Sequence, residues 1–363
     1  MRVLITSRSY VDTSSGLHEQ LDILAEKVDL YVMMPKEYKR ELKEYIVNES
    51  EFLNKKYKVF LMDLIFLKRD SALFYYKNMK AVLDKIKPDI IHIEEEPWTL
   101  FNYLLIKYSK QYNSKIIIFS WENIYQEFRF PLNYFEKYSI KNADYYLPGN
   151  EDAMEILIKK GWNKGVKVIP RYGINLNSFV RDESLRGKWN GFVIGFVGRL
   201  IHDKGLKYLF EAIRDFMDYT LVVIGGGPQE EEMRLLSKNL NVVFIKTINY
   251  KEMNRYISAF DVLVLPSITM PRWKEQFGHV LIEAMACGVP VIGSDSGEIP
   301  RVIGNAGLIF KEKDLFELKG CLLTLKNNSE LYNRLVKSGH QRVKEFSCDN
   351  IVGCFYDVYT NLV

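Results

Sequence analysis

Short runs of apolar residues alternate with amphipathic stretches along most of the chain. Continuous apolar runs are typical of strands that a parallel sheet buries on both faces, and the stretches between them have the spacing of helices. The pattern therefore predicts an α/β protein. The expected strands are Val3–Thr6, Val28–Met33, Ile90–Ile93, Lys115–Ser120, Tyr145–Pro148, Phe192–Gly198, Thr220–Gly225, Val242–Lys246, Val262–Pro266, Val291–Gly293 and Gly307–Phe310.

The series of strands breaks once and then restarts. Val166–Pro170 ends the first series, and the mostly polar stretch 171–190 has little periodicity, which is typical of a linker. A length of 363 residues fits two domains of about 150 residues each. Folds of this kind bind ligands at the carboxyl ends of parallel strands, so the functional residues are expected there.

Charge and cysteine content exclude several classes of protein. Lys and Arg number 50 against 46 Asp and Glu, and a net charge of +4 is too small for a nucleic-acid binder that neutralises phosphates. The four cysteines contain no Cys-x-x-Cys pair and indicate reduced thiols in a cytoplasmic protein. The chain begins with a strand rather than a signal peptide, and its apolar runs are far shorter than the roughly 18 residues of a membrane span.

The loop after the strand Phe192–Gly198 carries two cations, Arg199 and Lys204, just before a predicted helix, Leu206–Asp215. A guanidinium can hold phosphate oxygens with two parallel hydrogen bonds, and an ammonium at a helix entrance adds charge where free N–H groups also attract anions. Together they suit a diphosphate. Taken alone, the loop fits an ordinary solvated surface equally well, because Arg and Lys are common in exposed loops.

A second motif carries more information. Its apolar spacing predicts a helix from about Phe277, with Gly288 as the C-terminal cap. Glu275 precedes this helix and Glu283 lies inside it, roughly 10 Å away, so the two carboxylates suit opposite ends of an elongated polyhydroxyl ligand. The backbone amides of Phe277 and Gly278 point toward any anion beyond the helix start. An amphipathic helix with incidental acids is the less favoured interpretation.

Taken in order, these segments resemble the retaining family 4 glycosyltransferases, also called glycosyltransferase group 1. The resemblance covers nearly the whole chain, and three segments at matching strand ends rarely arise together by chance. It rests on Gly198-Arg199 with Lys204-Gly205, the glycine run Gly225–Pro228, the paired glutamates, the linker Ile169–Asn175, and Phe346-Ser347 before a terminal helix.

The resemblance implies a GT-B fold, in which two Rossmann-like domains face each other across a cleft and a C-terminal helix returns to the N-terminal domain. The implied parts are an acceptor-binding domain at 1–172, a hinge at 173–190, a nucleotide-sugar-binding domain at 191–345 and the returning helix at 346–363. The implied reaction moves a sugar from a nucleoside diphosphate sugar to a hydroxyl of a glycan or lipid-linked acceptor, with retention of configuration.

The resemblance also implies roles for single residues in binding the donor. Arg199 and Lys204 are expected to bind the diphosphate, Glu275 the hydroxyls of the donor sugar, and Glu283 the ribose. Electrostatic stabilisation of the departing diphosphate is then the main source of catalysis.

Further donor contacts follow by analogy with the family. Gly226 belongs to the glycine run, the base is expected beside Thr247 and Ile248, and Gly16 is expected to let a loop approach the donor phosphates, although a plain Ser/Gly turn also explains it. The run lacks the third glycine of G-x-G-x-x-G, which disfavours NAD. The chain has no Asp-x-Asp segment to hold a diphosphate-bound metal. Neither a metal nor a cofactor is therefore expected.

The chain departs from the family at the expected acceptor site. Many relatives carry a histidine after the strand Lys115–Ser120, whereas this chain reads Trp121-Glu122-Asn123. We expect Glu122 or Asn123 to orient the acceptor or the sugar by hydrogen bonds. The three acids Glu94–Glu96 follow the preceding strand, and capping of a helix that begins at Pro97 is favoured over a metal or acid/base role.

Lysines and aromatic residues gather between residues 55 and 80. Such a mixture suits a membrane surface, although solvated helix faces over an aromatic core are favoured. The sequence thus predicts a cytoplasmic transferase, with peripheral contact at the inner face of the membrane as an extension. Two other functions stay open. One is a nucleotide-sugar epimerase on the same architecture, which the spacing of the glutamates disfavours, and the other is a noncatalytic sugar-nucleotide sensor.

Overall fold

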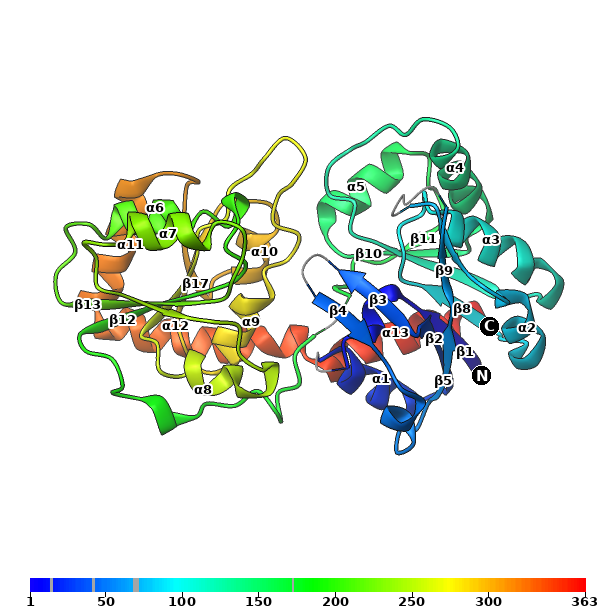
Figure 1. Cartoon of the computed structure of the whole chain (residues 1–363), viewed down its shortest axis with the longest axis horizontal. Coiled ribbons are helices and arrows are strands. Elements are labelled where there is room, and N and C mark those ends of the chain that lie inside the picture. The colour runs from blue at the N-terminus through cyan, green and yellow to red at the C-terminus, as the bar shows by residue number, and fades with distance from the viewer. Residues whose placement is uncertain (14–15, 41–42, 68–71, 172) are drawn as a thin grey trace. The chain divides into compact units, whose positions relative to one another are not determined.

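The computed structural model describes residues 1–13, 16–40, 43–67, 72–171 and 173–363. The chain divides into two compact units, each with a parallel sheet and flanking helices (Figure 1). Unit 1 comprises Met1–Gly173 and Cys348–Val363, and unit 2 comprises Ile174–Ser347. Residues 174–190 of the expected hinge lie within unit 2.

The main sheet of unit 1 has seven parallel strands in the order β11-β10-β9-β8-β1-β2-β5. The strands are β1 (Arg2–Thr6), β2 (Asp29–Pro35), β5 (Lys58–Met62), β8 (Ile90–Ile93), β9 (Lys115–Ser120), β10 (Tyr145–Pro148) and β11 (Gly165–Val166). From β1 the chain first proceeds outward through β2 to β5, and then continues from β8 on the other side. This reversal opens a crevice at the carboxyl ends of β1 and β8, the place where open α/β sheets bind ligands.

Helices cover both faces of this sheet. They are α1 (Leu17–Ala25), α2 (Met79–Ile86), α3 (Leu100–Ser109), α4 (Leu132–Asn142), α5 (Glu151–Lys159) and α13 (Cys348–Leu362). Because side chains alternate along a strand, Val3 and Ile5 share a core with α1 and α13, whereas Leu4 shares one with α2 and α3. The C-terminal helix α13 lies beside α1 and is part of unit 1, as the resemblance implies (Figure 1).

Two antiparallel hairpins extend unit 1. They are β3 (Glu37–Arg40) with β4 (Lys43–Ile46), and β6 (Leu64–Phe66) with β7 (Phe74–Tyr76). The expected strands include neither these hairpins nor β5, although residues 59–62 of β5 and all of β6 are short apolar runs. Phe74 and Tyr76 are buried, which agrees with an aromatic core in this region. Lys68 and Arg69, which belong to the basic and aromatic stretch between residues 55 and 80, lie outside the described residues.

The sheet of unit 2 has six parallel strands in the order β14-β13-β12-β15-β16-β17. The strands are β12 (Phe192–Val197), β13 (Tyr219–Ile224), β14 (Val242–Ile245), β15 (Val262–Leu265), β16 (Val291–Ser294) and β17 (Gly307–Phe310). All strands expected from the apolar pattern are present in the two units, with ends that differ by at most two residues.

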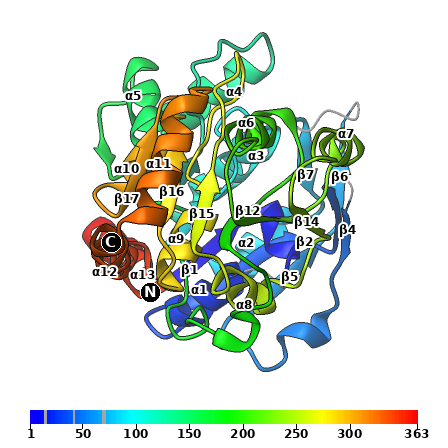
Figure 2. The ribbon, with the colours of Figure 1, turned by 90° about the vertical axis from the view of Figure 1, so that its left-hand side faces the viewer.

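The helices of unit 2 form two groups. They are α6 (Leu206–Ala212), α7 (Glu230–Leu236), α8 (Met253–Ile257), α9 (His279–Ala286), α10 (Ile299–Ile303), α11 (Leu315–Asn327) and α12 (Ser329–Arg342). Helices α6, α7 and α11 pack together, and α8, α9 and α12 pack together (Figure 2). The order of the strands reverses between β12 and β15, so the crevice of this sheet lies at the carboxyl ends of those two strands.

Candidate functional site

The candidate site of unit 2 is built from the loops that follow β12, β13 and β15. The N–H of Leu200, after β12, donates to the carbonyl of Gly226, after β13, at 2.9 Å. The N–H of Ile268, after β15, donates to the carbonyl of Asp203 at 2.8 Å. These bonds hold the loop with Arg199 and Lys204 between its two neighbours at the reversal of strand order.

Glycines allow the three loops to approach one another closely. A Cβ on Gly225, whose φ is +140°, would lie 2.0 Å from the carbonyl oxygen of Gly198. A Cβ on Gly205, whose φ is +67°, would lie 1.9 Å from the carbonyl oxygen of Pro266. No L side chain fits either position without moving backbone, since a Cβ contact below 3.0 Å is far inside van der Waals distance. The glycine run thus has a steric role in this loop cluster.

Lys204 and Glu275 form an ion pair at this reversal point. The ammonium Nζ lies 2.6 Å from Oε2 of Glu275, and the hydroxyl of Ser267 donates to the same oxygen at 2.7 Å. Their side chains are 15% and 8% exposed. A cation and a carboxylate that touch here can bind neighbouring parts of one ligand, an anionic group and a hydroxyl-bearing group.

The remaining predicted residues around this pair have different exposures. Arg199 is exposed, Phe277 is buried, and Gly278 precedes α9 with a φ of +88°. Helix α9 begins at His279, two residues later than the apolar pattern predicts. The N–H groups at this helix start are the positive end of its dipole.

Glu283 lies in α9 with its side chain half-buried. Burial raises the pKa of its carboxyl to about 7. No hydrogen bond to its side chain is present among the residues that the structure describes. A half-buried carboxylate can accept a hydrogen bond from a ligand hydroxyl.

Three more of the residues predicted to contact the donor lie in or near this loop cluster, and a fourth lies in unit 1. Gly226 is half-buried, Thr247 is exposed and Ile248 is half-buried after β14. Gly16 stands just before α1, with a φ of −62°, so its backbone conformation does not require glycine. Unit 1 also contains Glu122 and Asn123.

The acids after β8 have partners that their sequence position does not suggest. Glu94 accepts from Nε of Arg171 at 2.7 Å, and Glu95 accepts from Arg8, with the guanidinium NH2 at 2.8 Å. Glu96 accepts from the Ser120 hydroxyl at 2.7 Å and from the N–H of Trp121 at 2.8 Å.

The expected capping role of these acids is wrong. Helix α3 begins at Leu100 and is capped by Thr99, whose hydroxyl accepts from the N–H of Asn102. The three carboxylates instead bond to Arg8 after β1, to the end of β9 and to Arg171 of the linker. Residue types alone cannot show this pairing, because Arg171 and Glu94 are 77 residues apart in sequence.

Glu122 belongs to a buried ion cluster. Nζ of Lys160 lies 2.5 Å from Oε1 of Glu122 and 2.5 Å from Oε1 of Glu136, and all three side chains are at most 10% exposed. Asn123 is 7% exposed. Sequence reasoning missed Lys160, which comes directly after α5, the helix that follows β10.

Comparison of the whole structure with solved proteins identifies its class. It is similar in fold to Anabaena Alr3699/HepE solved in complex with UDP-glucose, with a TM-score of 0.74 and 16% identity over 99% of this chain and 100% of that one. The expected GT-B fold with two Rossmann-like units is therefore confirmed.

Comparison of the sequence then gives a family match for part of the chain. Residues 182–342 match the glycosyl transferases group 1, so the resemblance seen in the motifs is confirmed for this segment of unit 2. An uncharacterized glycosyltransferase of Methanocaldococcus jannaschii, MJ1178, is 28% identical over 63% of this chain and 63% of its own length.

A second relative is named for its substrates. The GDP-mannose-dependent monoacylated alpha-(1-6)-phosphatidylinositol monomannoside mannosyltransferase of Corynebacterium glutamicum is 31% identical over 42% of this chain and 45% of its own length. The chain thus matches less than two thirds of the length of these relatives.

Within the described ranges, no helix is long and apolar enough to cross a membrane.

Proposed function

We propose that this protein is a retaining glycosyltransferase that moves a sugar from a nucleoside diphosphate sugar to an acceptor hydroxyl without a metal. The observation that carries the proposal is the ion pair of Lys204 with Glu275 at the reversal point of the unit 2 sheet, with Arg199 exposed in the same loop as Lys204. The match of residues 182–342 to the group 1 family supports it, and the names of the relatives favour transfer over epimerisation or a sensor role.

In this proposal each part of the donor, from diphosphate to sugar, ribose and base, is bound by different residues. Arg199 and Lys204 bind the diphosphate, and Glu275, held against Lys204, accepts hydrogen bonds from the adjacent sugar. Glu283 binds the ribose, Thr247 and Ile248 lie beside the base, and Gly16 and Gly226 give the backbone access to the phosphates.

Catalysis is then mainly electrostatic. When the bond to the sugar breaks, negative charge grows on the departing diphosphate, and Arg199, Lys204 and the amides of Phe277 and Gly278 stabilise it. The two cations supply the charge that a divalent ion supplies elsewhere. The acceptor attacks on the face from which the diphosphate leaves, and a departing phosphate oxygen takes the proton of the acceptor hydroxyl. Glu122 and Asn123 orient the acceptor or the sugar.

The acceptor is proposed to be a glycan or a lipid-linked sugar, bound by unit 1. The relative from Corynebacterium glutamicum, by its name, acts on a phosphatidylinositol mannoside with GDP-mannose, whereas the Anabaena protein holds UDP-glucose. A binding test should therefore include both guanosine and uridine diphosphate sugars. A cytoplasmic protein with peripheral contact at the inner face of the membrane would fit a lipid-linked acceptor, although Lys55 and Lys56 of the basic region pair with Asp22 and Glu26.

Calorimetric titration with UDP- and GDP-sugars, with EDTA present throughout, tests the proposal. We expect one nucleotide series to bind, the Arg199→Ala variant to bind it at least tenfold more weakly, and Arg214→Ala, an exposed change elsewhere in unit 2, to bind it as the wild type does. Incubation with an acceptor panel should then give a glycoside with the donor's anomeric configuration by NMR. An epimerised donor without acceptor, binding without any turnover, or loss of binding in EDTA would overturn the proposal.

A further inference from the structure

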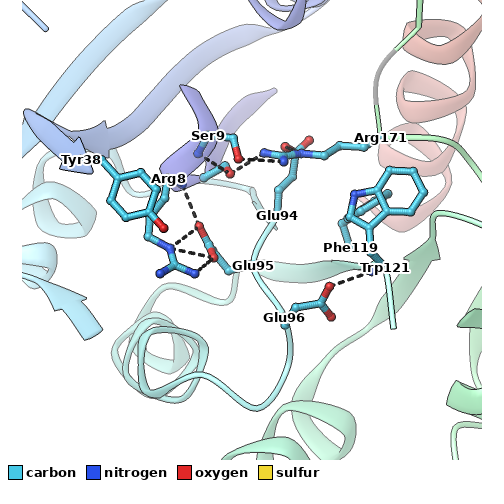
Figure 3. A pocket seen from close by; sticks show the side chains of 10 residues that line it. Arg8, Ser9, Tyr38, Glu94, Glu95, Glu96, Phe119, Trp121 and Arg171 are labelled. Atoms are coloured by element: carbon cyan, nitrogen blue, oxygen red, sulfur yellow. Dashed lines mark hydrogen bonds and ion pairs between the residues drawn. The ribbon is translucent and has the colours of Figure 1, made fainter. Parts of the chain in front are cut away.

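Unit 1 contains a pocket that the proposed donor site does not use. Its volume is about 200 Å³, and it opens at the carboxyl ends of β1, β8 and β9, where the strand order of this sheet reverses. Figure 3 shows Tyr38 and Arg8 on one side of it, and Phe119 and Trp121 on the other. This is the expected position for a ligand in an open parallel sheet.

The charges that line the pocket disfavour an anionic ligand. Both arginines are bonded to carboxylates, Arg171 to Glu94 and Arg8 to Glu95, and the Arg171 guanidinium also bonds to the hydroxyls of Ser7 and Ser9. Three glutamates stand against these two arginines along the described lining. A phosphate would meet guanidinium groups whose charge is already neutralised, together with carboxylate oxygens that repel it.

Trp121 is held in one position by its neighbours. Its backbone N–H donates to Oε1 of Glu96 at 2.8 Å, which fixes the main chain, and the Phe119 ring meets its indole edge to face at a centroid distance of 5.1 Å. The indole also packs against Gly149, where a Cβ would lie 2.3 Å from its Cε3. A half-buried indole whose position is set in advance offers a flat apolar surface at little entropic cost.

Hydrogen-bonding groups accompany this aromatic surface. Glu96 accepts two hydrogen bonds from the protein, and a carboxylate has about four acceptor positions, so it can accept from further hydroxyl donors. The Tyr38 phenol and the Ser9 hydroxyl add groups that can donate or accept. A pyranose ring combines the two matching features, a face of C–H groups that stacks on an aromatic ring and a rim of hydroxyls.

We propose that this pocket binds an uncharged pyranose ring of the acceptor, and that Trp121 is the residue that selects it. The inference rests on the proposed transferase function and makes it more specific. It assigns the acceptor of this protein to neutral glycosides rather than to compounds that present a phosphate to unit 1.

Ligand-observed NMR of the full-length protein tests the inference without requiring turnover. The probes are millimolar methyl glucoside, methyl mannoside and methyl galactoside, and the phosphate monoesters of the same sugars. We expect saturation transfer from the protein to at least one neutral glycoside, and binding of its phosphate monoester that is at least tenfold weaker.

Three variants test whether the indole of Trp121 binds the glycoside directly or only stabilises the fold. Trp121→Ala should weaken binding of the glycoside at least tenfold, and Trp121→Phe, which keeps an aromatic face, should weaken it by less than threefold. Gly149→Ala leaves the indole in the chain but pushes it from its position, so it should also weaken binding. Thermal unfolding and nucleotide titration of each variant show whether the fold and the donor site are intact.

The outcomes distinguish this inference from the proposed function. If the protein binds a nucleoside diphosphate but no neutral glycoside, or binds the phosphate monoester as tightly, the inference is wrong and the transferase proposal stands. The inference is also wrong if a folded Trp121→Ala variant binds the glycoside as the wild type does. If no nucleotide binds, the transferase proposal itself is wrong, and the assignment of the pocket to an acceptor is wrong with it.

Discussion

The two units have the same order of strands but differ in how they use arginine at the point where that order reverses. Each has a parallel sheet whose strand order reverses once, between β1 and β8 in unit 1 and between β12 and β15 in unit 2. In unit 2 the loops at the reversal pack through glycines and present an exposed Arg199. In unit 1, by contrast, Arg171 is only 9% exposed, and its guanidinium donates to the carboxylate of Glu94. A cation at a strand end is therefore not enough to indicate an anion site, because a buried arginine there can instead hold carboxylates of the fold.

The largest effect should come from removing the buried arginine of unit 1. Arg171→Met leaves the carboxyl of Glu94, which is 5% exposed, without its partner, and this should cost about 3 to 5 kcal/mol of unfolding free energy. Arg2→Met is the matched control, since its pair with Asp89 has side chains 43% and 34% exposed and should contribute at most about 1 kcal/mol. Urea unfolding of both variants measures the difference, and equal losses would contradict this account of unit 1.

The arginine of unit 2 should matter for rate rather than for folding. Arg199→Ala should raise the activation barrier of transfer by about 2 to 4 kcal/mol, because an exposed cation that stabilises the departing diphosphate is lost. Its unfolding free energy should change by no more than about 0.5 kcal/mol. Single-turnover kinetics and urea unfolding, with Arg214→Ala as control, check both parts. If Arg199→Ala lost as much unfolding free energy as Arg171→Met, the proposed difference between the two arginines would be wrong.

The close packing of the unit 2 loops can be tested with two neighbouring glycines. Gly225→Ala should destabilise unit 2 by about 1 to 3 kcal/mol, because its φ of +140° and its 2.0 Å approach to the Gly198 oxygen both exclude a Cβ. Gly226→Ala should be nearly neutral for folding, since its nearest neighbour would lie 3.7 Å from the new Cβ. If thermal unfolding finds the two variants equal, the loops are not packed as described.

The smallest effect concerns two glutamates, one in each unit, whose pKa values are raised from 4.5 to about 7, mainly by burial. Such a carboxyl binds a proton more tightly in the folded state, so the stability it contributes is present below about pH 4.5 and is lost as the pH rises toward 7. Glu283→Gln should therefore stabilise the protein at pH 8 by about 1 to 2 kcal/mol relative to its effect at pH 5.

The corresponding change in unit 1 should gain less. Glu96→Gln also removes the burial cost of a charge, but it weakens the hydrogen bonds from Ser120 and Trp121. Unfolding measured at both pH values distinguishes the two variants. A larger gain for Glu96→Gln than for Glu283→Gln would show that those two bonds contribute little to its stability.

The apolar runs were sufficient to predict the long buried strands, whereas the reversal of strand order is seen only in the structure. Strands such as Ile90–Ile93 and Lys115–Ser120 have the predicted bounds because every residue of the run is buried or nearly so. Strand β5 and the two hairpins were missed because each strand has only three to five residues, and most residues of β5 and β6 are only partly buried.

The candidate site was predictable in part. Arg199, Lys204 and Glu275 could be named because each follows a strand of the predicted sheet, and the structure joins Lys204 to Glu275. The partners of Glu94–Glu96 could not be predicted from the sequence, because their pairing depends on the register of β1, β8 and β9 and on the position of Arg171. Thr99 did carry a local signal, since a threonine before an apolar run is a preferred helix cap.

The return of α13 to unit 1 has a consequence for how the protein is made. Unit 2 is one uninterrupted segment, whereas the core of unit 1 includes Phe355 and Tyr359 near the end of the chain. On the ribosome, unit 2 is complete before the last helix of unit 1 has been translated. The part that is synthesised first is thus the last to close, and a nascent chain halted before α13 contains a whole unit 2 beside an open unit 1.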